Sequence, residues 1–186
     1  MTATQTSAPA ALTTWNIDAT HSQVEFAVKH LMISTVRGRF TGVSGALQLD
    51  ETDWTKSTVE ATVNTATIET GTEQRDAHLR SADFFDVEHF PALTFTSKRI
   101  EGKSPDRFQL IGDLTIHGVT REVTLDAAEE GRGGDPWGGE RIAFSAKTTI
   151  DRRDFGLTWN QALETGGVLV SNEVKISLEI QVTKAA

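Results

Sequence analysis

The chain has 186 residues, of which 38% are hydrophobic and 24% charged, a balance that fits one globular domain with a sizeable core. Its formal net charge of −8 argues against a nucleic-acid surface, which requires clusters of basic residues. Cysteine and tyrosine are both absent from the sequence, which excludes disulfides, thiolate nucleophiles, cysteine-ligated metals and a tyrosine general acid.

The first fourteen residues are small, polar and aperiodic, which predicts a flexible N-terminal arm over 1–14 and a single domain over 15–186. This segment has neither the basic region nor the apolar core of about 7–15 residues that a secretory signal needs. We therefore expect a cytoplasmic protein. No stretch approaches the ~18 apolar residues of a membrane-spanning helix, so we expect no stable membrane insertion.

From Trp15 onward, apolar and polar residues alternate with a period of two, the pattern of strands that bury one face. The last run is the most regular, since every second residue from Val174 to Val182 is apolar. The alternation predicts eight or nine strands, in the segments 15–18, 24–30, 40–50, 59–63, 93–96, 108–116, 119–125, 142–150 and 174–182.

One segment, about 72–84, is predicted to be a short helix. Thr70 and Glu73 have the spacing of a capping box, with Thr70 as the N-cap residue. Asp76 and Arg80 lie four residues apart in the favourable charge order.

Two segments lack a clear period. Residues 31–36 fit either a short helical turn or a loop. The glycine-rich run 129–139 lies between two predicted strands, so we interpret it as a flexible hairpin loop. A phosphate-binding loop would need a helix N-terminus to follow it.

Short connections such as the one at His117 and Gly118 predict antiparallel neighbours, because parallel crossovers need about a dozen residues. An antiparallel sheet of about eight strands leaves no exposed edge strand if it closes into a barrel, so we expect a barrel. A barrel of this size can be filled by side chains or can hold one small ligand. Small residues at inward positions favour a cavity: Gly45, Ala61, Gly112, Ala146 and Thr148.

None of the five histidines has the spacing of a metal-binding pair, so we expect no metal and no cofactor, and we assign no catalytic residue. His30 shares the inward parity of its strand. It is either a core histidine bonded to a backbone carbonyl or a polar group at the barrel mouth that touches a ligand head group. His117 is expected in a turn. His21 and Ser22 cannot act together as base and nucleophile, because neighbours on a strand point to opposite faces.

The charged segment 151–156 follows a predicted buried strand and has two interpretations. It is either a salt-bridged corner or a site that places Arg153 at the cavity, where a guanidinium could hold a polar head group. Arg37 and Arg39 have the same two interpretations.

A series of ordered motifs resembles the YceI-like family from about residue 15 to 182. The motifs are DATHS (18–22), KHLM (29–32), VRGRF (36–40), IETG (68–71), RD (75–76), HL (78–79), FFDV (84–87), FP (90–91), GDLT (112–115), GVT (118–120), RDFG (153–156) and SNEV (171–174).

The resemblance implies an all-β, lipocalin-like, eight-stranded antiparallel barrel that holds a polyisoprenoid, with quinone-type or fatty amide ligands as variants. Many members of the family are exported to the periplasm, whereas this chain shows no signal peptide. We expect a carrier or reservoir for a long-chain isoprenoid or other amphiphilic lipid, not an enzyme. A homodimer is compatible with this interpretation.

Two alternatives stay open: an isomerase or cyclase acting on a hydrophobic substrate, and a packed interaction or stress module without a ligand. Positions that match the family's motifs and also fall on a plausible inner face or lining helix are the expected ligand contacts. These are Phe26, Val28, His30, Met32, Arg37, Phe40, Leu79, Phe84, Phe85, Phe95, Leu114, Arg153, Phe155 and Trp159.

Overall fold

A computed structural model describes residues 11–186, and strands dominate this part of the chain. The arm predicted over 1–14 lies mostly outside the described residues, but residues 12–14 are strand, because they pair with β4. The strands are β1 (Leu12–Ile17), β2 (Gln23–His30), β3 (Ser34–Phe40), β4 (Val43–Asp50), β5 (Thr58–Asn64), β6 (Ile68–Glu69), β7 (Ala92–Ser104), β8 (Arg107–Ile116), β9 (Val119–Gly134), β10 (Glu140–Asp151) and β11 (Glu173–Lys184).

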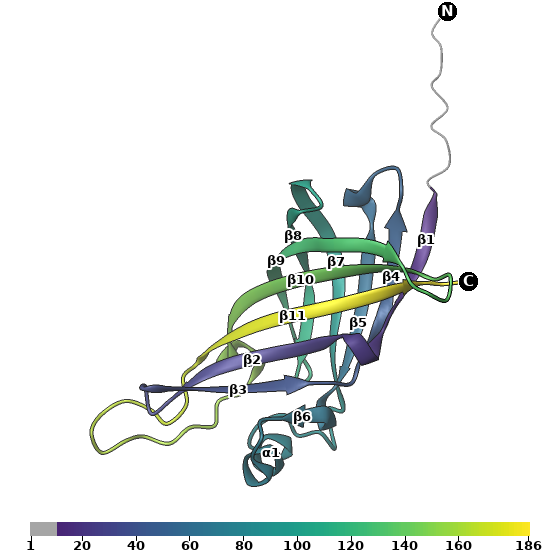
Figure 1. Ribbon diagram of the computed structural model, residues 1–186. Coiled ribbons are helices and arrows are strands. Elements are labelled where there is room, and N and C mark those ends of the chain that lie inside the picture. Colours follow the sequence, from purple (N-terminus) through teal and green to yellow (C-terminus); the bar gives the residue numbers. More distant parts are fainter. Residues whose placement is uncertain (1–10) are drawn as a thin grey trace, which may run out of the picture.

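Eight of these strands form a closed antiparallel barrel, which confirms the predicted fold class (Figure 1). Their hydrogen-bonded order is β1-β4-β5-β7-β8-β9-β10-β11, and antiparallel pairing between β1 and β11 completes the ring. Closure gives each of these strands two neighbours, so the ring presents no long unpaired edge.

The remaining strands extend the sheet beyond β11 in the order β2, β3, β6. β1 and β2 share one edge of β11: β1 pairs with residues 182–184, and β2 pairs with residues 175–179. The turn after β2 settles the ambiguous segment 31–36, because residues 31–33 form the turn and β3 starts at Ser34. The alternation did not reveal β3 as a separate strand, since three successive apolar residues interrupt the period.

The β9–β10 hairpin differs from the prediction. β9 continues to Gly134, so the first half of the run 129–139 pairs with β10 and only residues 135–139 form the turn. The prediction of a loop throughout this run is therefore wrong. Glycine weakens a strand but does not prevent ladder pairing when the neighbouring strand is long and regular.

The turn between β8 and β9 has the geometry that its sequence predicts. Ile116 pairs with Val119, which leaves a two-residue connection. His117 has φ 53° and Gly118 has φ 73°. Positive φ at both central residues is typical of the turns that join tightly twisted hairpins.

The helix α1 (Glu73–Arg80) confirms one short helix in the predicted region, but the predicted cap is wrong. Thr72 is the N-cap residue, and its side chain makes no capping bond. Thr70 donates its backbone N–H and its hydroxyl to the Asp76 carboxylate and accepts a bond from Arg75. These bonds tie the strand before α1 to the helix. The 3-10 helices are η1 (Ala19–His21), η2 (Trp54–Lys56), η3 (Thr65–Thr67) and η4 (Arg152–Phe155).

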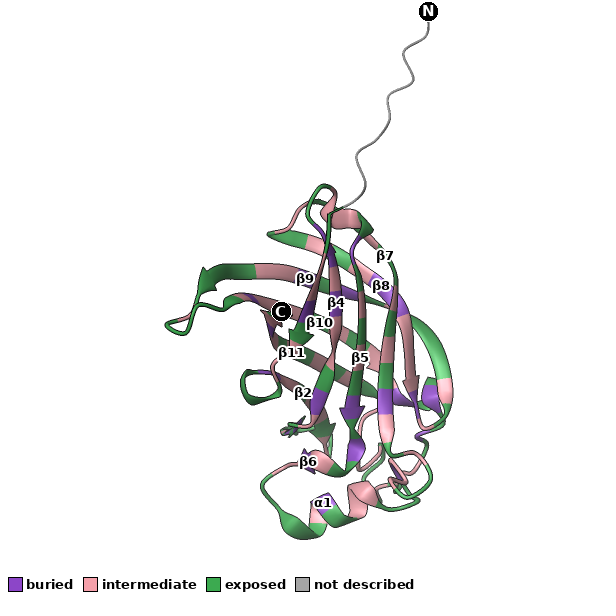
Figure 2. Ribbon diagram, turned by 90° about the vertical axis from the view of Figure 1, so that its right-hand side faces the viewer, coloured by how far each residue is buried: buried purple, intermediate pink, exposed green. Residues whose placement is uncertain are grey.

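Buried residues recur along the strands between exposed ones, as expected for a barrel with one inward face (Figure 2). They form two clusters, one towards each end of the barrel. The cluster nearer α1 consists of Phe40, Val43, Val63, Ile68, Leu93, Ile116, Phe155 and Leu157. The cluster nearer the N-terminal strand consists of Trp15, Leu47, Leu49, Ile142 and Val182.

Candidate ligand-binding cavity

The barrel contains an apolar cavity of about 440 Å³, within the range of roughly 300–1,000 Å³ usual for small-molecule sites. Every strand of the eight-stranded ring contributes lining residues, because one parity of each strand points inward. On β5, for example, Val59, Ala61 and Val63 line the cavity, whereas Glu60 and Thr62 are exposed on the outer face. A barrel plugged by its own side chains, one of the alternatives above, is inconsistent with this cavity.

The small inward residues contribute unequally to the space. Ala61, Ala146 and Thr148 line the cavity as expected. Gly112 does not, because a Cβ there would lie 2.6 Å from the ring of Phe95, which occupies the space. At Gly45, with φ 146°, a Cβ would lie 2.1 Å from a backbone oxygen of β5, so this glycine permits close approach of two strands.

Most of the residues expected to contact a ligand do lie around the cavity. They come from β2, β3, α1, β7, β8 and the segments that follow α1 and η4. The expected contacts that line it are Phe26, Val28, His30, Phe40, Leu79, Phe84, Phe85, Phe95, Leu114 and Trp159.

Four expected contacts lie elsewhere, and their prediction as lining residues is wrong. Met32 is exposed in the β2–β3 turn, and Arg37 is exposed on the outer face of β3. Arg153 is exposed and donates to the Asp151 carboxylate, with Nη2 2.6 Å from Oδ2. Phe155 is fully buried in the core cluster near α1 and fills protein space instead of facing the cavity.

Arg152, the neighbour of Arg153, reaches the cavity wall and is buried. Its Nε donates to the Ser171 carbonyl at 3.0 Å, and its Nη1 donates to the carbonyls of Leu157 and Trp159 at 2.7 and 2.9 Å. Nη2 donates to the Val170 carbonyl and the Asn172 side chain at 3.4 and 3.5 Å. Burial lowers the pKa of Arg152 from its ordinary value. All five N–H groups of the guanidinium are thus used to hold both ends of the segment 157–172.

An aromatic group lies at the end of the cavity next to α1. The ring centroids of His78 and Trp159 are 4.7 Å apart, and those of Phe84 and Trp159 are 5.2 Å apart. His78 also packs edge-on against Phe84. These three rings line the cavity and would offer ring edges and faces, with the polar imidazole of His78 among them, to a ligand.

The same end, here called the cationic end, carries Lys29, His30 and Arg75 besides the buried Arg152, while the remaining lining arginine, Arg132, pairs with Glu129 at the opposite end. The backbone of His30 pairs with Val170 in an isolated bridge, which fixes the histidine at the rim of β2. The only carboxylate among the lining residues of the described chain is Glu129, at the opposite end. A head group rich in oxygen acceptors would therefore meet donors, and no carboxylate, near α1.

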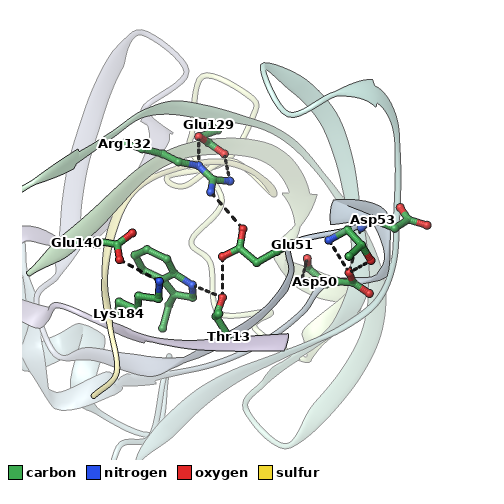
Figure 3. A network of polar contacts seen from close by, with 11 residues as sticks. Thr13, Asp50, Glu51, Asp53, Glu129, Arg132, Glu140 and Lys184 are labelled. Atoms are coloured by element: carbon green, nitrogen blue, oxygen red, sulfur yellow. Dashed lines mark hydrogen bonds and ion pairs between the residues drawn. The ribbon is translucent and has the colours of Figure 1, made fainter. Parts of the chain in front are cut away.

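At the opposite end, a cluster of charged residues linked by ion pairs and hydrogen bonds extends across the barrel opening (Figure 3). Arg132 donates from Nε and Nη2 to both oxygens of Glu129, at 2.6 and 3.0 Å, and its Nη1 lies 3.9 Å from Glu51 Oε2. The bond to Glu129 raises the pKa of Arg132. Glu51 also accepts from the Thr13 hydroxyl at 3.0 Å, which links this group to β1.

Strand parity alone could not place Arg132. β9 has a bulge at Glu130, because Phe144 pairs with Glu129 while Ala143 pairs with Gly131. A bulge reverses the alternation, so both Glu129 and Arg132 face the cavity although their numbers differ in parity.

A polar corner next to this end contains Asp18, a carboxyl with a strongly lowered pKa. Asp18 Oδ2 lies 2.8 Å from His21 Nδ1 and accepts a bond from Arg141 at 2.7 Å. Asp18 Oδ1 accepts from the Thr20 N–H at 3.0 Å. These bonds, chiefly the one with His21, lower the pKa of Asp18 from 3.8 to about 2. At the C-terminal end of β10, the bond from Arg153 likewise lowers the pKa of Asp151 to about 2.

We expect Asp18→Asn to weaken the dependence of stability on acidic pH. A carboxyl whose pKa is lowered by folding stabilises the fold fully above its unfolded pKa of about 3.9 and loses that contribution as the pH falls towards its folded value. The variant should therefore be less stable than the wild type at pH 5–7, and the gap should narrow between about pH 4 and 2. Urea unfolding measured across this range checks the result; a gap that stays constant would contradict it.

Two general properties of the described residues bear on function. Among residues 11–186, no three histidine, aspartate or glutamate side chains are grouped so that they could hold a metal ion. In the same range, no helix has the length and apolar character needed to cross a bilayer.

The chain is similar in sequence to proteins of one family. A family model described as the YceI-like domain matches residues 15–182. A UPF0312 protein of Staphylococcus epidermidis is 41% identical over 165 residues, covering 88% of this chain and 94% of that protein. A UPF0312 protein of Staphylococcus aureus is 39% identical over the same length, with the same coverage of both chains.

Solved structures share the fold. The YCEI protein of Campylobacter jejuni is 30% identical with a TM-score of 0.72, covering 85% of this chain and 90% of that one. BcnA of Burkholderia cenocepacia has a TM-score of 0.77 at 22% identity, with 89% and 98% covered. A polyisoprenoid binding domain from Saccharophagus degradans has a TM-score of 0.67 at 16% identity, with 94% and 99% covered. The last two similarities show the fold alone.

Proposed function

Because the chain belongs to the YceI-like domain family, we propose that its barrel binds a long isoprenoid-type lipid, polyprenyl or quinone-like, and acts as a carrier or reservoir. The observation that carries the proposal is the apolar cavity of about 440 Å³ enclosed by all eight strands of the ring. The structural neighbour from Saccharophagus degradans, described as a polyisoprenoid binding domain, supports the ligand class. None of the relatives reported above is named as an enzyme.

The affinity of such a cavity follows from the burial of hydrocarbon. Each buried methylene contributes about 0.8 kcal/mol relative to water, so about ten methylenes contribute roughly 8 kcal/mol. This corresponds to a dissociation constant near 1 μM before the entropy of ordering the chain is subtracted. A bilayer solvates the same chain nearly as well, so transfer between bilayer and barrel is close to neutral, as a reversible carrier requires.

Selectivity for the head group would then arise at the cationic end of the cavity. His30 and Arg75 line this end and could donate hydrogen bonds to oxygen atoms of a ligand, whereas the exposed Lys29 donates its ammonium to Thr35 on the outer face. This assignment keeps His30 from the sequence prediction and replaces the exposed Arg37 and Arg153 by residues that the cavity reaches. The hydrocarbon would extend past Phe26 and Phe95 towards the Glu129 end.

The direct test is to extract purified full-length protein with organic solvent and identify the lipids by mass spectrometry. We expect an isoprenoid-type lipid in a fixed ratio to protein, because dissociation of a long chain into water is unfavourable. Delipidated protein should also take up an added fluorescent polyprenyl analogue. Protein that carries no lipid and binds no added analogue would overturn the proposal.

A further inference from the structure

Three consecutive apolar side chains protrude from the turn between β2 and β3. Leu31, Met32 and Ile33, here called the 31–33 tip, are 38%, 57% and 80% exposed. Only two other large hydrophobic residues in the described chain are exposed, Leu12 and Trp137, and neither has an exposed apolar neighbour of this size beside it in sequence. Single exposed apolar residues need no explanation, whereas contiguous ones mark interaction sites.

The backbone holds these side chains in the solvent. Leu31 and Met32 have φ of 53° and 61°, a left-handed conformation that non-glycine residues rarely adopt. The turn is fixed by bonds from the Ile33 N–H to the His30 carbonyl at 3.2 Å and from the Leu31 N–H to the Leu169 carbonyl at 2.9 Å. A defined and strained turn that exposes its apolar side chains fits a binding function better than a packing function.

The tip is continuous with the cavity. His30, Leu169 and Val170 line the cavity, and the first two are joined to the tip by the bonds just described. The segment 157–172 lies against the tip, since a Cβ at Gly167 would be 3.6 Å from the side chain of Met32. Figure 1 shows this segment and the β2–β3 turn projecting together beyond the barrel.

The charge around the tip differs from that of the whole molecule. The chain carries a net charge of −8, yet no acidic residue occurs between Glu25 and Asp50. This acid-free stretch contains the exposed Lys29 and Arg37, and Arg39, which lies further from the tip and pairs with the Glu69 carboxylate. The one acidic residue of the adjoining segment 157–172 is Glu164. Basic groups beside exposed apolar residues are the combination that binds anionic lipid surfaces.

We infer that the 31–33 tip docks this end of the barrel on an anionic lipid bilayer, reversibly and at the level of the head groups. A narrow, protruding tip can enter a fluid bilayer, but it offers too little area for a stable protein interface, which needs about 800 Å² per partner. The purpose of docking rests on the proposed function, because a lipid could then pass between bilayer and cavity without crossing water. Docking itself can be measured without any ligand in the barrel.

The first experiment is co-sedimentation of the full-length protein with vesicles of phosphatidylcholine alone or with a quarter of phosphatidylglycerol. We expect binding to the anionic vesicles that weakens as salt is raised. The double variant Met32→Ser, Ile33→Ser should bind at least about tenfold more weakly, because the apolar contribution is lost. The matched control is Trp137→Ser, which removes an exposed apolar residue from the β9–β10 turn and should bind like the wild type.

The second experiment reports insertion directly. The chain has no cysteine, so Ile33→Cys can be labelled with a single environment-sensitive fluorophore. We expect a blue shift on anionic vesicles, and no shift when the label is placed at Trp137→Cys. Absence of binding by the wild type, equal binding by the double variant, or a shift only at position 137 would overturn the inference. A concentration-dependent dimer that the double variant abolishes, without vesicle binding, would overturn it in favour of an interface between two copies.

The two proposals can fail separately. Met32 does not line the cavity, and neither does Ile33, so the double variant should retain its co-purified lipid. Lipid in the barrel without vesicle binding would refute docking and leave the proposed function intact. Vesicle binding by protein whose barrel takes up no lipid would support docking and refute the carrier function.

Discussion

Replacing Arg152 by methionine is expected to lower the free energy of unfolding by roughly 3 kcal/mol or more. The buried guanidinium donates to five acceptors, and its removal leaves the carbonyls of Leu157, Trp159 and Ser171 without their donors. For a chain of this length, such a loss corresponds to a fall in Tm of roughly 6–12 °C. Chemical denaturation and thermal unfolding followed by circular dichroism measure both quantities.

The adjacent Arg153 provides a matched control. Its side chain is exposed and binds only the nearby Asp151, so Arg153→Met should change stability little. Arg152→Lys keeps the charge but offers three donors in place of five, and we expect it to recover only a minor part of the lost stability. Similar effects of the two methionine variants would contradict the role assigned to Arg152.

These two arginines also show how far sequence patterns lead. The inward parity of β10 is carried by Ile142, which is buried in the core, and by Phe144, Ala146, Thr148 and Ile150, which line the cavity. One further step of the same alternation reaches residue 152. The dense charge of the segment 151–156 instead favoured Arg153 as the arginine that faces a ligand. The alternation therefore points to Arg152, and the hydrogen bonds of its guanidinium show that this residue holds the segment 157–172 in place.

The fold could be predicted because a closed antiparallel barrel repeats one simple rule along the chain. Alternation identified the inward face of β2, β5, β8, β10 and β11, and short connections implied antiparallel order. The rule failed where the backbone departs from regular pleating. The bulge at Glu130 depends on the register with Ala143 and Phe144 of β10, and the left-handed turn at Leu31 and Met32 is held by a bond to the distant Leu169.

The cavity could be predicted only in part. Ala61 indicates space correctly, whereas Gly112 does not, because the ring of Phe95 covers it. Whether a small residue leaves a void depends on the side chain opposite, and a single sequence does not show that partner. The cationic end could not be predicted for a similar reason. Arg75 lies on α1, and the alternation of the strands does not show where this helix packs on the barrel.

The largest effect on ligand binding is expected from Ala61→Trp. Ala61 lies in the middle of β5 and lines the cavity, so an indole at this position would occupy the path of a bound chain. If the indole displaces about four methylenes, the ligand loses roughly 3 kcal/mol of binding free energy. This is a weakening of about a hundredfold, which should abolish co-purification of the lipid. Extraction and mass spectrometry, together with uptake of the fluorescent analogue, measure it.

The neighbouring position separates blocking of the cavity from damage to the strand. Thr62 is exposed on the outer face of β5, so Thr62→Trp adds the same side chain to the same strand without entering the cavity. This variant should bind lipid as the wild type does. Because tryptophan is well accepted in strands, both variants should keep the far-ultraviolet circular dichroism of the wild type. Equal lipid binding by the two variants would mean that the ligand does not lie inside the barrel, and the cavity would lose its proposed role.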